Sequence, residues 1–292
     1  LAKLPAGVQL FAMFHTHPEL LDVVAEIMGG APKLADQLSR RPDRLEAILN
    51  DDYRGPPPAL EELIAECDND VRQGAFFEDK LDIARRWAGD RRFLIGLQIL
   101  RGQMKPVDSG PALSHIAEAV LRAMLAAVRQ ELEIHHGTVP GGRVMLLAMG
   151  KLASKELMPG SDLDLILIYD APEDCTGSDG AKPLAVSAYY SRLCQRLVNA
   201  LTALTAEGML YEIDLRLRPS GNKGPLACSL TAFDSYHRKD AWTWEHMALS
   251  RARAVAGDTD LCETVDRVIS AILKSPRDPA KLLGDVYSMR LK

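Results

Sequence analysis

GKLASKELMPGSDLDLILIYD, residues 150–170, places two carboxylates at the start of a long aliphatic run. The run Leu163–Tyr169 has the length and apolarity of a buried strand. Because side chains alternate in direction along a strand, Asp162 and Asp164 point to the same side. At an effective dielectric near 20 and a separation of about 5 Å, such a pair costs roughly 3 kcal/mol. A cation must therefore neutralise the pair, and a divalent metal is the candidate that these residue types favour.

The segment LYEIDLRLRP, residues 210–219, carries a third carboxylate. Its strict alternation predicts a strand with one packed face and one polar face. A predicted turn and helix between the two strands give a connection long enough to bring them side by side. Asp214 is then expected to join the first two aspartates. The polar face of this second strand consists of Glu212, Asp214, Arg216 and Arg218.

Three carboxylates that hold two Mg²⁺ ions, beside guanidinium groups, suit nucleotidyl transfer from a nucleoside triphosphate. Two metals about 3.5–4 Å apart can stabilise the attacking and leaving oxygens of an in-line displacement. Bidentate arginine contacts suit the departing pyrophosphate. The residue types alone also allow a second interpretation, in which the first two aspartates cap a strand end and Asp214 pairs with Arg216 or Arg218.

Several blocks of sequence then become recognisable. Gly150-Lys151-Leu152, Glu156-Leu157 and Ser161–Leu165 resemble the nucleotidyltransferase motif of the glutamine synthetase adenylyltransferase family. YEIDLRLRPSGNKGPL and AWTWEHMALSRARAVAGD resemble the same family, and all blocks follow in its order. The likeness covers 149–258, with a weaker likeness over the N-terminal part. Enzymes of this family carry two related units, and RPSG with AWTWEH is more similar to the C-terminal, AMP-attaching unit than to the AMP-removing one.

The resemblance implies a polymerase-beta-like nucleotidyltransferase domain that uses ATP and Mg²⁺. It would attach AMP to a tyrosine hydroxyl of glutamine synthetase and release pyrophosphate, which regulates nitrogen assimilation. Asp162 and Asp164 match the paired metal-binding aspartates of the family, and Asp214 matches the third acidic residue. All three are expected to be catalytic, with Asp214 helping to deprotonate the tyrosine, whose pKa is near 10. The candidate nucleotide-binding residues are Gly150, Lys151, Ser154, Ser161, Arg216, Arg218 and Lys223.

Some of these assignments have alternatives. Lys151 reaches the triphosphate or is simply solvated, and the loop that holds Lys223 binds phosphate or only connects two strands. Ala153 and Ser154 stand where the family usually has Gly-Gly or Gly-Ser, and Ala takes positive φ less easily than Gly.

The segment that follows holds two further pairs of interest. Arg251 and Arg253 would face one side on a strand and could contact the nucleotide, whereas on a helix they would diverge at the surface. Trp242 and Trp244 are expected to pack on the core rather than stack on a base.

Two other functions remain open for this sequence. One is the reverse activity, removal of AMP by phosphorolysis in the same enzyme family. The other is a non-catalytic module that binds glutamine synthetase or a PII-type signal protein through its helices. A PII-type protein is in any case an expected partner of the full-length enzyme.

Composition excludes several classes of protein. The net charge of −5 argues against a nucleic-acid-binding surface. Five scattered cysteines without a CxxC pair predict free thiols rather than a disulfide framework or a zinc site. The sequence shows no apolar stretch near 18 residues and no secretion signal, so we expect a cytoplasmic protein without membrane contact. It starts at Leu1 without an initiator methionine, which predicts a piece of a longer protein.

The expected fold class is α+β. A helical N-terminal region is predicted over 1–110, where Pro18, Pro32 and Pro42 each open a short amphipathic segment. The nucleotidyltransferase domain, with a short mixed sheet, is predicted over 111–258. The start of a C-terminal helical region follows over 259–292.

Overall fold

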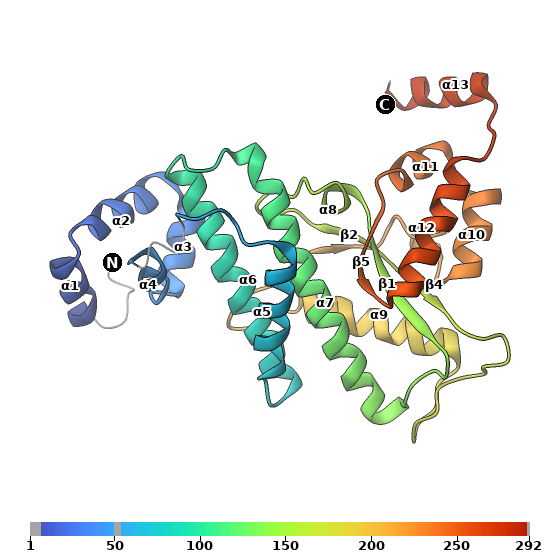
Figure 1. The fold of residues 1–292 in the computed structure, drawn as a ribbon, viewed down its shortest axis with the longest axis horizontal. Coiled ribbons are helices and arrows are strands. Elements are labelled where there is room, and N and C mark those ends of the chain that lie inside the picture. The colour runs from blue at the N-terminus through green and yellow to red at the C-terminus, as the bar shows by residue number, and fades with distance from the viewer. Residues whose placement is uncertain (1–6, 50–53, 291–292) are drawn as a thin grey trace.

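A computed structural model describes residues 7–49 and 54–290 of the chain. Within these residues the fold is α+β, as predicted: one small mixed sheet is covered by helices, and an all-helical region extends from one side of it (Figure 1). The first four helices pack with the end of α6 (Phe77–Leu100) around a separate core that includes Leu20, Ile27 and Phe93. These four helices are α1 (Gly7–Thr16), α2 (Glu19–Gly30), α3 (Pro32–Arg40) and α4 (Arg44–Leu49).

A long buried helix, α7 (Ser109–His136), connects the helical region to the sheet (Figure 1). Together with α5 (Leu60–Arg72) and α6 it contributes to the same hydrophobic core as the strands. The predicted domain boundary at residue 110 stays a prediction, although this core extends across it. By length and composition alone, one helix among the described residues, Pro106–His136, is long and apolar enough to cross a membrane, and the search of the sequence for an apolar stretch missed it. Inside this molecule 78% of its apolar window is buried, as in a core helix.

The sheet is built around β2 (Leu163–Asp170). β2 pairs antiparallel with β1 (Arg143–Ala148), and β1 pairs antiparallel with β5 (Arg253–Gly257). On its other edge β2 pairs parallel with β3 (Ile213–Asp214) and β4 (Ala227–Ser229), so the sheet is mixed, as predicted. The remaining elements are α8 (Gly150–Ala153), α9 (Val186–Thr202), α10 (Leu230–Lys239), α11 (Thr243–Leu249), α12 (Thr259–Leu273), α13 (Pro279–Arg290) and the 3-10 turns Pro106–Asp108 and Gly221–Lys223.

Alternation along β2 decides which side of the sheet carries the carboxylates. Leu163, Leu165 and Leu167 enter the core formed with α7 and α9. The residues between them, Ile166 and Ile168, enter the core formed with α10, α11 and α12. Since side chains two residues apart on a strand share a face, Asp164 lies on the side of α10–α12, and Asp162 is exposed just before β2.

Arg85 is a buried cation that joins α6 to the segment after α9. Its guanidinium donates hydrogen bonds to four carbonyl oxygens while the residue is only 2% exposed. This burial lowers its pKa. Because Arg85→Met removes these four hydrogen bonds, we expect the free energy of unfolding to fall by about 3 kcal/mol, measured by urea denaturation. Arg86→Met on the same helix, where the side chain is 45% exposed, is the control. Equal losses for the two variants would contradict this prediction.

Candidate active site

Two of the predicted carboxylates lie side by side where β2 and β3 begin, and the third, Asp162, is exposed one residue before β2. The two strands run parallel and place Asp164 directly opposite Asp214. The ladder starts with the Leu163 amide, which donates to the Glu212 carbonyl oxygen at 2.9 Å. Burial raises the pKa of Asp164, and the negative charges of Asp162 and Asp214 raise it further. The predicted convergence of the two strands is therefore confirmed.

The chain turns immediately after Asp214, so the long strand predicted over 210–219 is wrong: β3 spans only Ile213–Asp214. The Arg216 amide donates to Asp214 Oδ1 at 2.7 Å, which closes an Asx-type turn. This local hydrogen bond competes with strand pairing, and alternation of side chains cannot reveal it. The arginines at 216 and 218 consequently do not share one strand face.

Asp214 is bound by Arg216 through its side chain as well. Nε and Nη2 of Arg216 donate to Asp214 Oδ2 at 2.8 and 2.5 Å. The Asp214 side chain is 12% exposed, whereas the Arg216 side chain is 73% exposed. These hydrogen bonds lower the pKa of Asp214 and raise that of Arg216. The pairing that the sequence left open as an alternative is thus present.

The donor types at this end of the sheet fit a hard divalent cation. Mg²⁺ prefers carboxylate oxygens, and a cation would relieve the repulsion that raises the pKa of Asp164. Within residues 7–49 and 54–290, however, no group of three or more His, Cys, Asp or Glu side chains is arranged as a metal site. Since Asp214 is bound by Arg216, its carboxylate must turn away from that partner before it can act as a ligand.

Helix α8 places a glycine against the central carboxylate. Gly150 has φ +52°, and a Cβ built on it would lie only 2.2 Å from Asp164 Oδ2. Lys151 is exposed on this turn, and its positive charge offsets part of the rise in the pKa of Asp164. Ala153 lies within α8, and its φ is not positive, so this position does not require the glycine that the family usually has. Ser154 donates its hydroxyl to the Gly150 carbonyl oxygen at 3.1 Å.

The other predicted nucleotide-binding residues differ in exposure and in whether their side chains already form hydrogen bonds within the protein. Ser161 accepts a hydrogen bond from the Met158 amide and closes a turn. Arg218 is 7% exposed, and its guanidinium donates hydrogen bonds to the carbonyl oxygens of Leu215 and Pro225, which stabilises this loop. Its positive charge also contributes to lowering the pKa of Asp214. Lys223 is exposed in the 3-10 turn of that loop.

Sequence reasoning missed one buried carboxylate and misplaced two tryptophans. Glu118 lies in HIAEAVLRAM on α7, is 1% exposed and binds Arg253. An acidic residue within an otherwise apolar helical face was the available signal. Trp242 and Trp244 are 72% and 44% exposed, so the expectation that they pack on the core is wrong.

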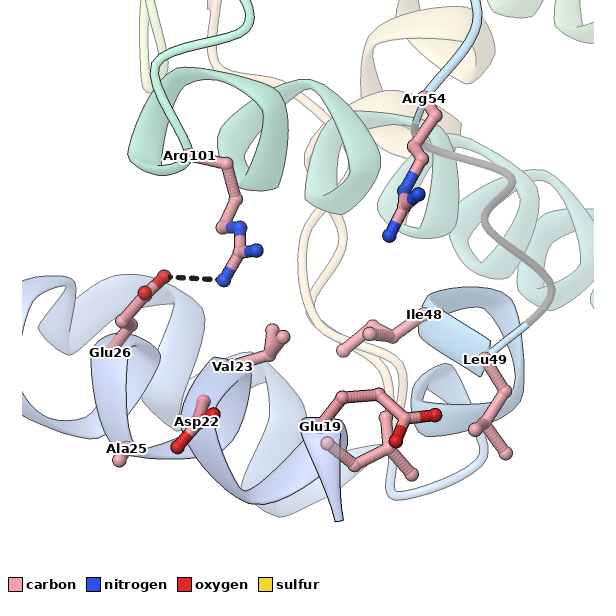
Figure 2. Close-up of a pocket in the computed structure, with 10 residues that line it drawn as sticks. Glu19, Asp22, Val23, Ala25, Glu26, Ile48, Leu49, Arg54 and Arg101 are labelled. Atoms are coloured by element: carbon pink, nitrogen blue, oxygen red, sulfur yellow. Dashed lines mark hydrogen bonds and ion pairs between the residues drawn. The ribbon is translucent and has the colours of Figure 1, made fainter. Parts of the chain in front are cut away.

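A cavity of about 580 Å³ lies between α2, the end of α4 and the end of α6 (Figure 2). It has acidic residues on α2 and two arginines opposite them, and Glu26 pairs with Arg101 at 3.0 Å. It shares no residue with the three-carboxylate cluster, so it plays no part in that site.

Comparison with known proteins gives one consistent result. Residues 21–268 match the family described as glutamate-ammonia ligase adenylyltransferase. Proteins named bifunctional glutamine synthetase adenylyltransferase/adenylyl-removing enzyme match 99% of this chain, with 49% identity in Mesorhizobium japonicum, 47% in Agrobacterium fabrum and 48% in Brucella suis. The chain spans 29–30% of the length of these relatives.

Proposed function

Because this chain belongs to the glutamate-ammonia ligase adenylyltransferase family, we propose that it transfers AMP from ATP to a tyrosine hydroxyl of glutamine synthetase. The observation that carries the proposal is the opposition of Asp164 and Asp214 on adjacent parallel strands, with Asp162 one residue before β2. The phenolic oxygen attacks the α-phosphorus, and the bond to pyrophosphate breaks. PII-type signal proteins are proposed as partners of the full-length enzyme.

The charges of the site suggest a role for each group. Mg²⁺, when held by the three aspartates, would neutralise the triphosphate. Asp214 is the proposed acceptor for the phenol proton, once its carboxylate has turned away from the Arg216 guanidinium. The exposed Arg216 guanidinium can exchange Asp214 for phosphate oxygens, which present the same paired acceptors. Lys151 adds a second exposed cation whose charge acts on Asp164.

Removal of AMP by phosphorolysis is the second candidate, because the relatives are named for both activities and this chain matches less than a third of their length. The attaching activity is favoured by RPSG and AWTWEH, at 218–221 and 241–246, which are more similar to the C-terminal unit.

One experiment separates these activities. The chain is incubated with Mg²⁺, ATP labelled on the α-phosphate and unmodified glutamine synthetase, and in parallel with inorganic phosphate and adenylylated glutamine synthetase. We expect label on the target in the first reaction and no release of ADP in the second. The reverse pattern would assign the removing activity, and no turnover in either would support a binding module.

A further inference from the structure

Arg253 binds the carbonyl groups at the end of α8. It is the first residue of β5 and pairs with Ala148 in the β1–β5 ladder. Its Nε donates to the Ala153 carbonyl oxygen at 3.2 Å, and its Nη2 to that of Leu152 at 3.4 Å. The last carbonyl groups of a helix have no partners within the helix, and their dipoles favour a cation. The guanidinium therefore fixes the place where α8 ends.

Glu118 on α7 balances the charge of this arginine. Its side chain is 2% exposed and accepts hydrogen bonds from Arg253 Nη1 at 2.5 Å and from Arg122 Nη2 at 3.1 Å. Removing a carboxylate from water costs several kcal/mol unless it is paired and hydrogen-bonded, and both conditions are met here. Arg122 also donates to the Val255 carbonyl oxygen at 2.8 Å. The Glu118–Arg253 pair thus connects α7, β5 and α8.

The opposite end of α8 contacts the carboxylate cluster. α8 is a single turn, Gly150–Ala153, and Gly150 lies against Asp164. Such a short element cannot absorb a displacement along its length, so a shift at Ala153 reaches Gly150. Lys151 and Ser154, the other two predicted nucleotide-binding residues of this turn, shift with it.

We propose that Glu118 and Arg253 are positioning residues for the nucleotide. Their ion pair holds α8 where Gly150, Lys151 and Ser154 meet the triphosphate. This inference rests on the proposed function and deepens it. Both side chains act through α8 rather than on the reacting atoms, so the expected effect is on nucleotide affinity and much less on the rate at saturation.

The test compares three glutamine variants. Arg253→Gln and Glu118→Gln remove one partner each, and Arg143→Gln removes an arginine that binds Asp170 and Asp260 at the far end of β1. Affinity is measured by calorimetry with a non-hydrolysable ATP analogue and Mg²⁺, beside KM, kcat and amide exchange over 150–155. Losing one charge-assisted hydrogen bond network should weaken ATP-analogue binding and raise KM roughly tenfold in the first two variants. In these two variants the rate of amide exchange over 150–155 should rise, and kcat should stay near the wild-type value. For Arg143→Gln the affinity, KM, kcat and amide exchange should all stay near wild type.

The affinities of the variants test the positioning role, and the affinity of the wild-type chain tests the proposed function. Equal ATP-analogue affinity in wild type and in both folded variants would overturn the inference alone and leave the function standing. A wild-type chain that binds no ATP analogue would remove both. Arg253→Lys keeps the charge but not the fork of donors, so intermediate affinity is expected. It also answers the question if Arg253→Gln does not fold.

Discussion

Asp164→Asn is expected to lower AMP transfer by a factor on the order of 10³ while making the metal-free chain more stable at neutral pH. Burial and the charges of Asp162 and Asp214 make this carboxylate's charge unfavourable in the fold, whereas the proposed function requires that charge. Asn keeps the size of the side chain and removes the negative charge that would hold Mg²⁺. An opposite response of activity and stability is typical of a functional residue and not of a structural one.

The dependence of this stability gain on pH follows from the direction of the shift. The folded pKa of Asp164 lies above its ordinary value, so the folded state holds its proton to a higher pH than the unfolded chain does. The stabilisation from protonation is complete below the unfolded pKa, near 4, and is lost as the pH rises through the folded pKa. Wild type and Asp164→Asn should therefore be equally stable at low pH and diverge toward pH 7.

Urea denaturation without Mg²⁺, at several values between pH 3.5 and pH 7, measures this difference, and the α-labelled ATP assay measures turnover. Asp234→Asn, which changes a surface carboxylate paired with Arg238, is the control and should leave the turnover unchanged. A variant at Asp164 that keeps its turnover would remove this residue from the mechanism. A variant that is less stable at pH 7 would show that the charge is already compensated in the fold.

Periodicity predicted those parts of the fold that local pattern determines. The β2 strand and the approach of Asp214 to Asp164 follow from the spacing of apolar residues and from alternation along strands. The 210–219 segment follows alternation equally well, yet only Ile213–Asp214 forms a strand. There the side chain of Asp214 binds the backbone two residues ahead, and no pattern of apolar and polar residues encodes such a bond.

Interactions between distant segments could not be predicted for a different reason. Glu118 and Arg253 are separated by 135 residues, and their contact depends on how α7 packs against β5. One sequence identifies an acidic residue in an apolar helix but not its partner. The predicted nucleotide-binding set likewise gave residue types without their contacts, so the loop-binding role of the Arg218 guanidinium was missed.

Gly150→Ala is expected to reduce turnover about 100-fold, because the new Cβ would require the central carboxylate to move by about 1 Å or more. A Cβ at this position would lie 2.2 Å from Asp164 Oδ2, closer than any non-bonded contact allows. The backbone φ of +52° adds strain of about 1 kcal/mol for a residue with a side chain. The substitution thus has two effects, backbone strain at Gly150 and loss of the space beside Asp164.

Gly208→Ala separates these two contributions. Gly208 also has a positive φ, +91°, but a Cβ there meets nothing within 4 Å. Both variants carry backbone strain and should lose stability in urea denaturation, with the larger loss in Gly150→Ala because of its clash, whereas only Gly150→Ala should lose turnover. If the two variants lose turnover equally, strain alone explains the loss. If Gly150→Ala stays fully active, the Asp164 carboxylate adopts another position without consequence, and its contact with α8 does not define the reactive geometry.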